Sequence, residues 1–239
     1  MQRAQQLLDR IHRRYQTVQT SVRVDDLQIE LVRIADPNVV LDQVAAEEDR
    51  LEKISGRRIK EDQLHLPYWA ELWDSAHALA ELLPSYRPTV AESLSILDLG
   101  CGMGLAGTVA ARLGMRVLFA DIEPPALLFA RLNSLPDAAR VRTRKLDWRT
   151  DRLAEKFDLI LGADILYERK QWDYLEPFWR VHLNPGGTIL LGEPGRQTGD
   201  LFEPWIAARG WTPQIQRVSV PARTTPIRIF TLSAPGSVR

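Results

Sequence analysis

Near the middle of the chain, Asp98 is followed by glycines at every second position: Gly100, Gly102 and Gly104. A short apolar run precedes the aspartate, and an Ala- and Leu-rich helical pattern follows the last glycine. Glycine is needed where a backbone turns tightly or where a ligand contacts the main chain without meeting a Cβ atom. A strand, a glycine-rich loop and a helix in this order hold a nucleotide-like cofactor at the carboxyl edge of a parallel sheet.

Acidic and aromatic residues end three further apolar runs. Asp121 closes the next run, roughly 20 residues after the first glycine, where an acid receives ribose hydroxyls. Asp147 and Trp148 end another run, where an acid can accept from an adenine amine and an indole can stack on a purine. Asp164 and Tyr167 follow a fourth, and their position beside the glycine loop favours a catalytic role. Each site also has a structural interpretation, as a helix cap, a turn or a packed ring.

Alternating strands and helices must position these residues. The spacing predicts strands at 94–99, 116–120, 142–146, 157–163 and 188–191, and helices at 105–113, 124–133 and 201–209. Two closing runs, 214–220 and 227–232, are too close for a helical crossover and should pair antiparallel. The expected fold class is α/β, with a doubly wound, mostly parallel seven-stranded sheet and a C-terminal antiparallel hairpin.

An N-terminal extension is expected over residues 1–66, ahead of a cofactor-binding domain at 67–239. Its pattern predicts a helix over 4–15, a hairpin over 22–32 that turns at two aspartates, and an exposed charged stretch over 42–60. Pro67 then opens a helix, since apolar residues follow it at helical spacing as far as Leu83.

The composition restricts the partners and the compartment. The chain of 239 residues has 31 Lys and Arg and 31 Asp and Glu, and this balance argues against non-specific nucleic-acid binding. Its single cysteine excludes an internal disulfide framework and fits a reducing compartment, and no Cys/His cluster has metal spacing. No apolar run approaches the ~20 residues that span a bilayer. We therefore expect a cytoplasmic monomer without a metal site.

The glycine loop fits two cofactor templates. Asp98-x-Gly100-x-Gly102-x-Gly104 is similar to motif I of class I S-adenosylmethionine (SAM) methyltransferases, and Gly102-x-Gly104-x-x-Gly107 satisfies the dinucleotide fingerprint. A dehydrogenase needs a separate substrate domain with an acid–base residue, often histidine. The four histidines are scattered and no second α/β domain follows, so the sequence favours SAM.

Together, motif I, Leu146-Asp147-Trp148 and Asp164-x-x-Tyr167 resemble the seven-strand SAM-dependent methyltransferases of the Asp-x-x-Tyr group. That group includes protein-lysine methyltransferases and the enzymes that act on the electron-transfer flavoprotein β subunit. The resemblance continues in Pro67-Tyr68-Trp69-Ala70-Glu71-Leu72-Trp73 and Gly192-Glu193-Pro194-Gly195-Arg196, and covers residues 64–235. It implies an enzyme that N-methylates a protein lysine.

The resemblance also implies a role for individual residues. The glycines would wrap the methionine part of SAM, Asp121 would bind its ribose, and Asp147 and Trp148 would hold its adenine. Asp164 would accept an N–H of the substrate amine and orient it, with Tyr167 positioning the amine or lining its channel. The cofactor-binding residues implied are Trp73, Asp98, Gly100, Gly102, Gly104, Asp121, Asp147, Trp148 and Asp164.

Two features leave the substrate open. Flavoprotein-type members usually carry small residues or Pro-Gly-Gly after the tryptophan of the preceding helix, whereas this chain has Asp74-Ser75-Ala76-His77. The C-terminal hairpin carries Arg217, Arg223 and Arg228, which either are solvated or bind an acidic partner. A small-molecule N-methyltransferase and a SAM-binding interaction protein without turnover are the alternatives to a protein methyltransferase.

Overall fold

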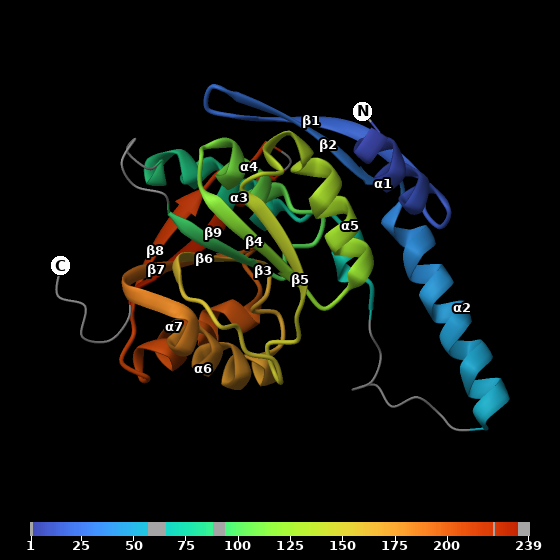
Figure 1. The fold of residues 1–239 in the computed structure, drawn as a ribbon. Helices are drawn as coiled ribbons and strands as arrows, with labels where there is room; N and C mark the ends of the chain where they lie inside the picture. The colour runs from blue at the N-terminus through green and yellow to red at the C-terminus, as the bar shows by residue number, and fades with distance from the viewer. Residues whose placement is uncertain (1, 57–65, 88–93, 222, 234–239) are drawn as a thin grey trace.

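A mixed β-sheet forms the centre of the computed structural model, which describes residues 2–56, 66–87, 94–221 and 223–233 (Figure 1). The strands of the sheet are β3 (Ser95–Leu99), β4 (Arg116–Asp121), β5 (Val141–Lys145), β6 (Phe157–Ala163), β7 (Leu183–Glu193), β8 (Thr212–Val218) and β9 (Ile227–Ser233). They lie in the order β5-β4-β3-β6-β7-β9-β8. Neighbouring strands from β5 to β7 in this order run parallel to each other, and β9 runs antiparallel to both β7 and β8. The expected fold class is confirmed.

Helices cover both faces of this sheet (Figure 1). They are α3 (Asp74–Leu82), α4 (Leu105–Arg112) and α5 (Pro124–Asn133) on one face, and α6 (Trp172–His182) and α7 (Gln197–Ala207) on the other. The apolar core on the first face includes Val109 and Phe119. The core on the second face includes the buried rings of Trp172, Trp179 and Phe202. Because apolar layers enclose the sheet on both sides, the polar strand ends become the place where ligands can reach the backbone.

The N-terminal segment folds as a helix, a hairpin and a second helix. These are α1 (Gln2–His12), β1 (Thr17–Val24), β2 (Leu27–Ile34) and α2 (Pro37–Ser55). The hairpin turns at the two expected aspartates, with Val24 paired to Leu27. Asn133 of α5 bonds both the N–H and the carbonyl of Val32, at 2.8 and 3.1 Å. The segment therefore shares its core with the sheet domain, and the division at residue 66 stays a prediction.

Helix α2 begins at an Asp36 cap and extends away from the rest of the molecule (Figure 1). Val40 is its only buried residue, in agreement with the expected exposure of the charged stretch over its described part. Residues 57–60 of that stretch lie outside the described residues. No helix in the described part of the chain is both long and apolar enough to cross a membrane.

The prediction of a continuous helix from Pro67 is wrong. A 3-10 turn over Tyr68–Ala70 is followed by an extended segment, and α3 begins only at Asp74. Glu71 and Trp73 have extended backbone angles, and the indole Nε1 of Trp73 donates to the carbonyl of Tyr68 at 2.8 Å. Helical spacing of apolar residues is preserved across the break, which explains why periodicity alone did not reveal it.

Candidate active site

A cavity lies at the carboxyl edge of the parallel strands. The loops after β3, β4, β5 and β6 line it together with the segment that precedes α3. Eight of the residues predicted from the sequence line this cavity: Trp73, Gly100, Gly102, Asp121, Asp147, Trp148, Asp164 and Tyr167. Parallel strands deliver their following loops to one edge, which is why Gly100 and Tyr167 meet there although they lie 67 positions apart in the sequence.

The glycine loop is held against β4 by its own backbone. Gly100 and Cys101 donate their N–H groups to the carbonyl of Ala120, at 2.8 and 3.1 Å. Gly100 and Gly102 have φ angles of 66° and 50°, in the left-handed region that favours glycine. A Cβ on Gly100 would also lie 2.9 Å from the side chain of Ile165. Main chain therefore faces the cavity at this loop.

Asp98, Gly104 and Gly107 do not line the cavity. The carboxylate of Asp98 is buried and accepts the N–H of Gly107 at 2.9 Å, and burial raises its pKa to about 7. A Cβ on Gly104 would lie 2.8 Å from the Cβ of Ala130, and one on Gly107 would collide with Phe119. These three residues allow α4 and its preceding loop to pack closely against the sheet and α5, so they support the loop from the side away from the cavity.

Asp121 faces the cavity and orders the loop at the same time. Its two carboxylate oxygens accept the N–H groups of Gly102 and Glu123, each at 2.9 Å. Burial raises its pKa to about 6, although the two backbone bonds lower it. A carboxylate oxygen has more than one acceptor position, so each can also take a ligand hydroxyl.

The end of β5 contributes an indole and a carboxylate. Trp148 is fixed by a 3.1 Å hydrogen bond from its Nε1 to Gln171. Asp147 accepts from the side chain of Arg149, at 2.7 Å for the shortest contact, and also from the backbone N–H of that residue. A flat ring in a fixed orientation is suited to stacking on a purine, and the carboxylate beside it is already held by a cation.

Asp164 has an uncommon backbone conformation at the end of β6. Its φ is 53°, a value that few residues other than glycine adopt, and its N–H donates to the carbonyl of Gly192 at 2.8 Å. The side chain is buried and makes a two-pronged ion pair with Arg196, at 2.7 Å and 3.2 Å. The strain and the pairing together aim a negative group at the cavity.

Aromatic rings form the wall beside Asp164. The ring of Tyr167 lies edge-on to Tyr68, with centroids 5.2 Å apart, and Tyr68 lies 6.4 Å from Trp73. Burial, followed by the nearby Glu168 carboxylate, raises the pKa of Tyr167 to about 12. Tyr167 therefore stays a neutral phenol, which can donate or accept a hydrogen bond but does not act as a tyrosinate base.

Arg196 contacts two of the predicted site residues, although the sequence pattern assigned no role to it. Besides pairing with Asp164, its guanidinium lies 5.8 Å from the ring centroid of Trp73. Its position directly after the carboxyl end of a parallel strand is the signal that would have found it.

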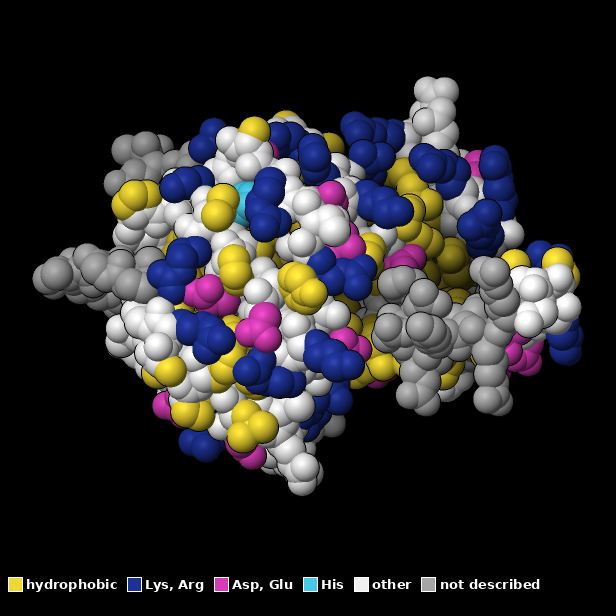
Figure 2. Space-filling model, turned by 90° about the horizontal axis from the view of Figure 1, so that it is seen from below, with side chains coloured by type: hydrophobic (Ala, Val, Ile, Leu, Met, Phe, Trp, Pro, Cys, Tyr) yellow, Lys and Arg dark blue, Asp and Glu magenta, His cyan; other side chains and the backbone are white. Residues whose placement is uncertain are grey.

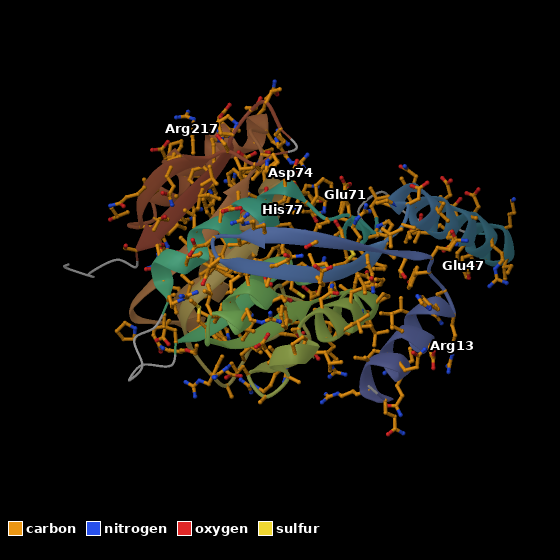
Figure 3. All side chains as sticks on the ribbon, turned by 90° about the horizontal axis from the view of Figure 1, so that it is seen from above. Arg13, Glu47, Glu71, Asp74, His77 and Arg217 are labelled. Atoms are coloured by element: carbon orange, nitrogen blue, oxygen red, sulfur yellow. The ribbon has the colours of Figure 1, made fainter. Side chains whose placement is uncertain are left out.

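A buried carboxylate supports the loop that carries Arg196. Glu193 accepts the N–H groups of Gly195 and Arg196 and pairs with Arg228, which also pairs with Asp200. Arg223 bonds the carbonyl of Pro194 and pairs with Asp74, a residue at the start of α3 that Figure 3 labels. Two of the three arginines of the C-terminal cluster are therefore engaged within the protein, which argues against a partner site that depends on those two.

Comparison with known proteins agrees with this geometry. The family profile described as "Lysine methyltransferase" matches residues 54–200. The electron transfer flavoprotein beta subunit lysine methyltransferase of Danio rerio is 36% identical over 137 residues, which cover 54% of this chain and 51% of the relative. The protein N-lysine methyltransferase METTL21A of Xenopus tropicalis is 37% identical over 142 residues, which cover 56% of this chain and 63% of the relative. The matched regions thus span about half to two thirds of these relatives.

Solved structures show the same fold. The glycopeptide N-methyltransferase MtfA superimposes with a TM-score of 0.59 at 14% identity, covering 68% of this chain and 91% of that one. The ribosomal protein L11 methylase of Lactobacillus delbrueckii subsp. bulgaricus gives a TM-score of 0.56 at 21% identity, covering 75% and 90%. With the family profile matched across the site, the chain belongs to the lysine methyltransferase family.

Proposed function

We propose that this protein transfers a methyl group from SAM to the side-chain amine of a lysine in a protein substrate. The observation that supports this most strongly is the single cavity that contains the glycine loop, Asp121, Trp148, Asp164 and Tyr167. The glycine loop, Asp121 and Trp148 suit a nucleoside with an amino-acid tail, and Asp164 and Tyr167 suit an amine. The curated relatives that match are protein lysine methyltransferases, in agreement with this division.

The residues of the cavity fit SAM. The backbone at Gly100 and Gly102 approaches without side chains, so the amino-acid tail can lie against main chain. The carboxylate of Asp121 keeps acceptor positions for the two ribose hydroxyls, and Trp148 offers an indole face to the adenine. When bound, SAM supplies a methyl group on a positively charged sulfur, which is already electrophilic.

The protein must then present a neutral amine. A lysine amine has an unperturbed pKa of about 10.4, so it loses a proton to solvent before it can attack. A lone Asp164 would favour the charged ammonium, because opposite charges attract. Arg196 offsets this effect, since its guanidinium already balances the carboxylate. Asp164 is then left to accept an amine N–H on a remaining lone pair and to orient the nitrogen.

The aromatic wall completes the channel. Tyr68, Trp73 and Tyr167 present ring surfaces that can contact the methylene stem of a lysine and exclude water. Tyr167 keeps its proton, so its hydroxyl can position the amine by hydrogen bonding. Correct alignment of nucleophile, methyl carbon and leaving group contributes on the order of 7–11 kcal/mol in well-oriented reactions.

Incubation with methyl-tritiated SAM and a cell lysate tests the proposal. We expect label in a protein band with the wild type and none with Asp164→Ala. Asp173→Ala is the matched control, because Asp173 also pairs with arginines but does not line the cavity. Label in the small-molecule fraction would instead favour a small-molecule N-methyltransferase, and no label at all would favour a SAM-binding protein without turnover.

We also propose the cytoplasm as the place of action, since the single cysteine suits a reducing compartment. No cluster of three or more His, Cys, Asp or Glu side chains in the described part of the chain is placed to hold a metal ion. The proposed chemistry needs none, because the methyl donor is activated by its own charge.

A further inference from the structure

A groove with cationic rims runs between α1, the start of α5 and the edge strand β5. Its walls include the ring of Tyr15 and the side chains of Pro124, Pro125, Leu127 and Leu128. Six cations line it and the hollow that adjoins it along α1: Arg3, Arg10, Arg13, Arg14, Arg131 and Lys145. We call this surface the α1–α5 groove. Figure 2 shows a face rich in Lys and Arg side chains, several of which border a hollow with hydrophobic walls.

The cations of the groove differ from the paired arginines around the loop after β7. Within the described part of the chain, Arg3, Arg10, Arg13, Arg131 and Lys145 form no ion pair, and all five are exposed. Only Asp9 and Glu123 contribute negative charge to the lining. In contrast, Arg196, Arg223 and Arg228 are all paired with carboxylates. Six cations against two carboxylates therefore leave the lining of the groove with a net positive charge.

The groove adjoins the proposed active site. Glu123 lines both the groove and the cavity. Tyr15 of the groove also packs edge-on against Trp69 of the cavity wall, with ring centroids 5.3 Å apart. A chain bound along the groove would therefore pass next to the cavity.

We propose that the α1–α5 groove binds an acidic segment of the protein substrate, next to the lysine that enters the cavity. This proposal rests on the proposed function for its link to catalysis. The cations supply charge complementarity to Asp and Glu side chains, and the apolar walls take up the hydrophobic residues between them. Sites of this kind raise the rate of association, because the field draws the partner toward the cavity.

A peptide fits this surface better than a nucleic acid does. Phosphate chains are bound by cations and polar donors in nearly continuous tracks, whereas the centre of this groove is made of proline, leucine and tyrosine side chains. The carboxylates of Asp9 and Glu123 would also repel evenly spaced phosphates. A peptide that alternates acidic and apolar residues meets neither obstacle.

Fluorescence anisotropy tests the proposal with a labelled synthetic peptide of glutamates and interspersed leucines. The groove variant is Arg13→Glu with Arg131→Glu, and Figure 3 shows Arg13 extending outward near the end of α1. The control variant is Lys156→Glu with Arg217→Glu, which reverses two exposed charges that line neither the groove nor the cavity. We expect peptide affinity to fall about tenfold in the groove variant and to stay within about twofold in the control.

Three results would overturn the proposal: no binding of the peptide to the wild type, an equal loss in both variants, or tighter binding of an oligodeoxythymidylate of the same charge. Arg13→Gln with Arg131→Gln provides a milder variant if the charge reversals lower the melting temperature. Because the peptide assay requires no SAM and no turnover, it remains informative if the chain proves not to transfer methyl groups. Conversely, labelled lysate proteins without peptide binding would contradict only the groove.

Discussion

Replacement of Asp121 by asparagine tests how the cavity recognises its cofactor. The wild-type carboxylate accepts two backbone N–H groups at 2.9 Å and faces the cavity with its remaining acceptor positions. Asparagine keeps one acceptor oxygen and replaces the other by an NH₂ donor, so at least one hydroxyl contact is lost. A hydrogen bond to a charged group contributes about 1.5–3 kcal/mol. We therefore expect SAM to bind about 10- to 100-fold more weakly to Asp121→Asn.

The pH dependence of binding provides a second signature of the same residue. Burial raises the pKa of Asp121 to about 6, so the free protein loses its acceptor carboxylate as the pH falls through that value. Affinity for SAM should decrease below pH 6 in the wild type and change little with pH in Asp121→Asn. Isothermal titration calorimetry from pH 5 to pH 8 measures both effects.

Asp98→Asn is the matched control for this experiment. Asp98 is also buried at a neighbouring strand, and burial raises its pKa to about 7, but it bonds Gly107 and does not line the cavity. Its replacement should leave the decrease of SAM affinity below pH 6 in place. Unchanged SAM affinity in Asp121→Asn, or the same pH profile in the wild type and that variant, would refute the assignment of Asp121 to the cofactor.

Three further predictions follow from the site and its support. Arg196→Met should lower the rate of methyl transfer about tenfold at saturating SAM, with partial recovery in Arg196→Lys; the estimate is modest because the guanidinium is partly exposed. An unchanged rate would remove Arg196 from the mechanism. Gly107→Ala should lower the free energy of unfolding by about 1–3 kcal/mol in chemical denaturation, since its Cβ would lie 2.7 Å from Asp98 and collide with Phe119; a neutral effect would contradict the tight helix contact. Finally, the raised pKa of Asp98 adds stability that is fully present below its unfolded value of 3.8 and is lost as the pH rises through about 7. The melting temperature of the wild type should fall more steeply with rising pH over this range than that of Asp98→Asn. Equal slopes for the two proteins would contradict this prediction.

The sheet and most of the cavity were predictable because strand ends carry their signal locally. An apolar run that ends in an acid identifies both the strand and a residue that lines the cavity, as at Asp121 and Asp164. The predicted strand 157–163 coincides with β6, and the predicted helix 124–133 coincides with α5. Parallel topology then brings these ends together without further information.

Other features depend on contacts that a sequence pattern does not contain. The motif grouped Asp98 and Gly104 with Gly100 and Gly102, yet packing against α5 and the sheet turns the first two away from the cavity. The partner of Asp164 lies 32 positions further along the chain. The break before α3 depends on a hydrogen bond from Trp73 to a backbone carbonyl. Tertiary contacts of this kind override local periodicity.

The most direct test of the proposed function separates cofactor binding from methyl transfer in one variant. Asp164→Ala removes the carboxylate that we propose to orient the amine but leaves Asp121, Trp148 and the glycine loop in place. With tritiated SAM and lysate protein, we predict no transfer by this variant and a SAM dissociation constant within about threefold of the wild type. Full transfer by Asp164→Ala, or lost SAM binding with normal turnover at saturating SAM, would contradict the assignment of Asp164 to the substrate amine.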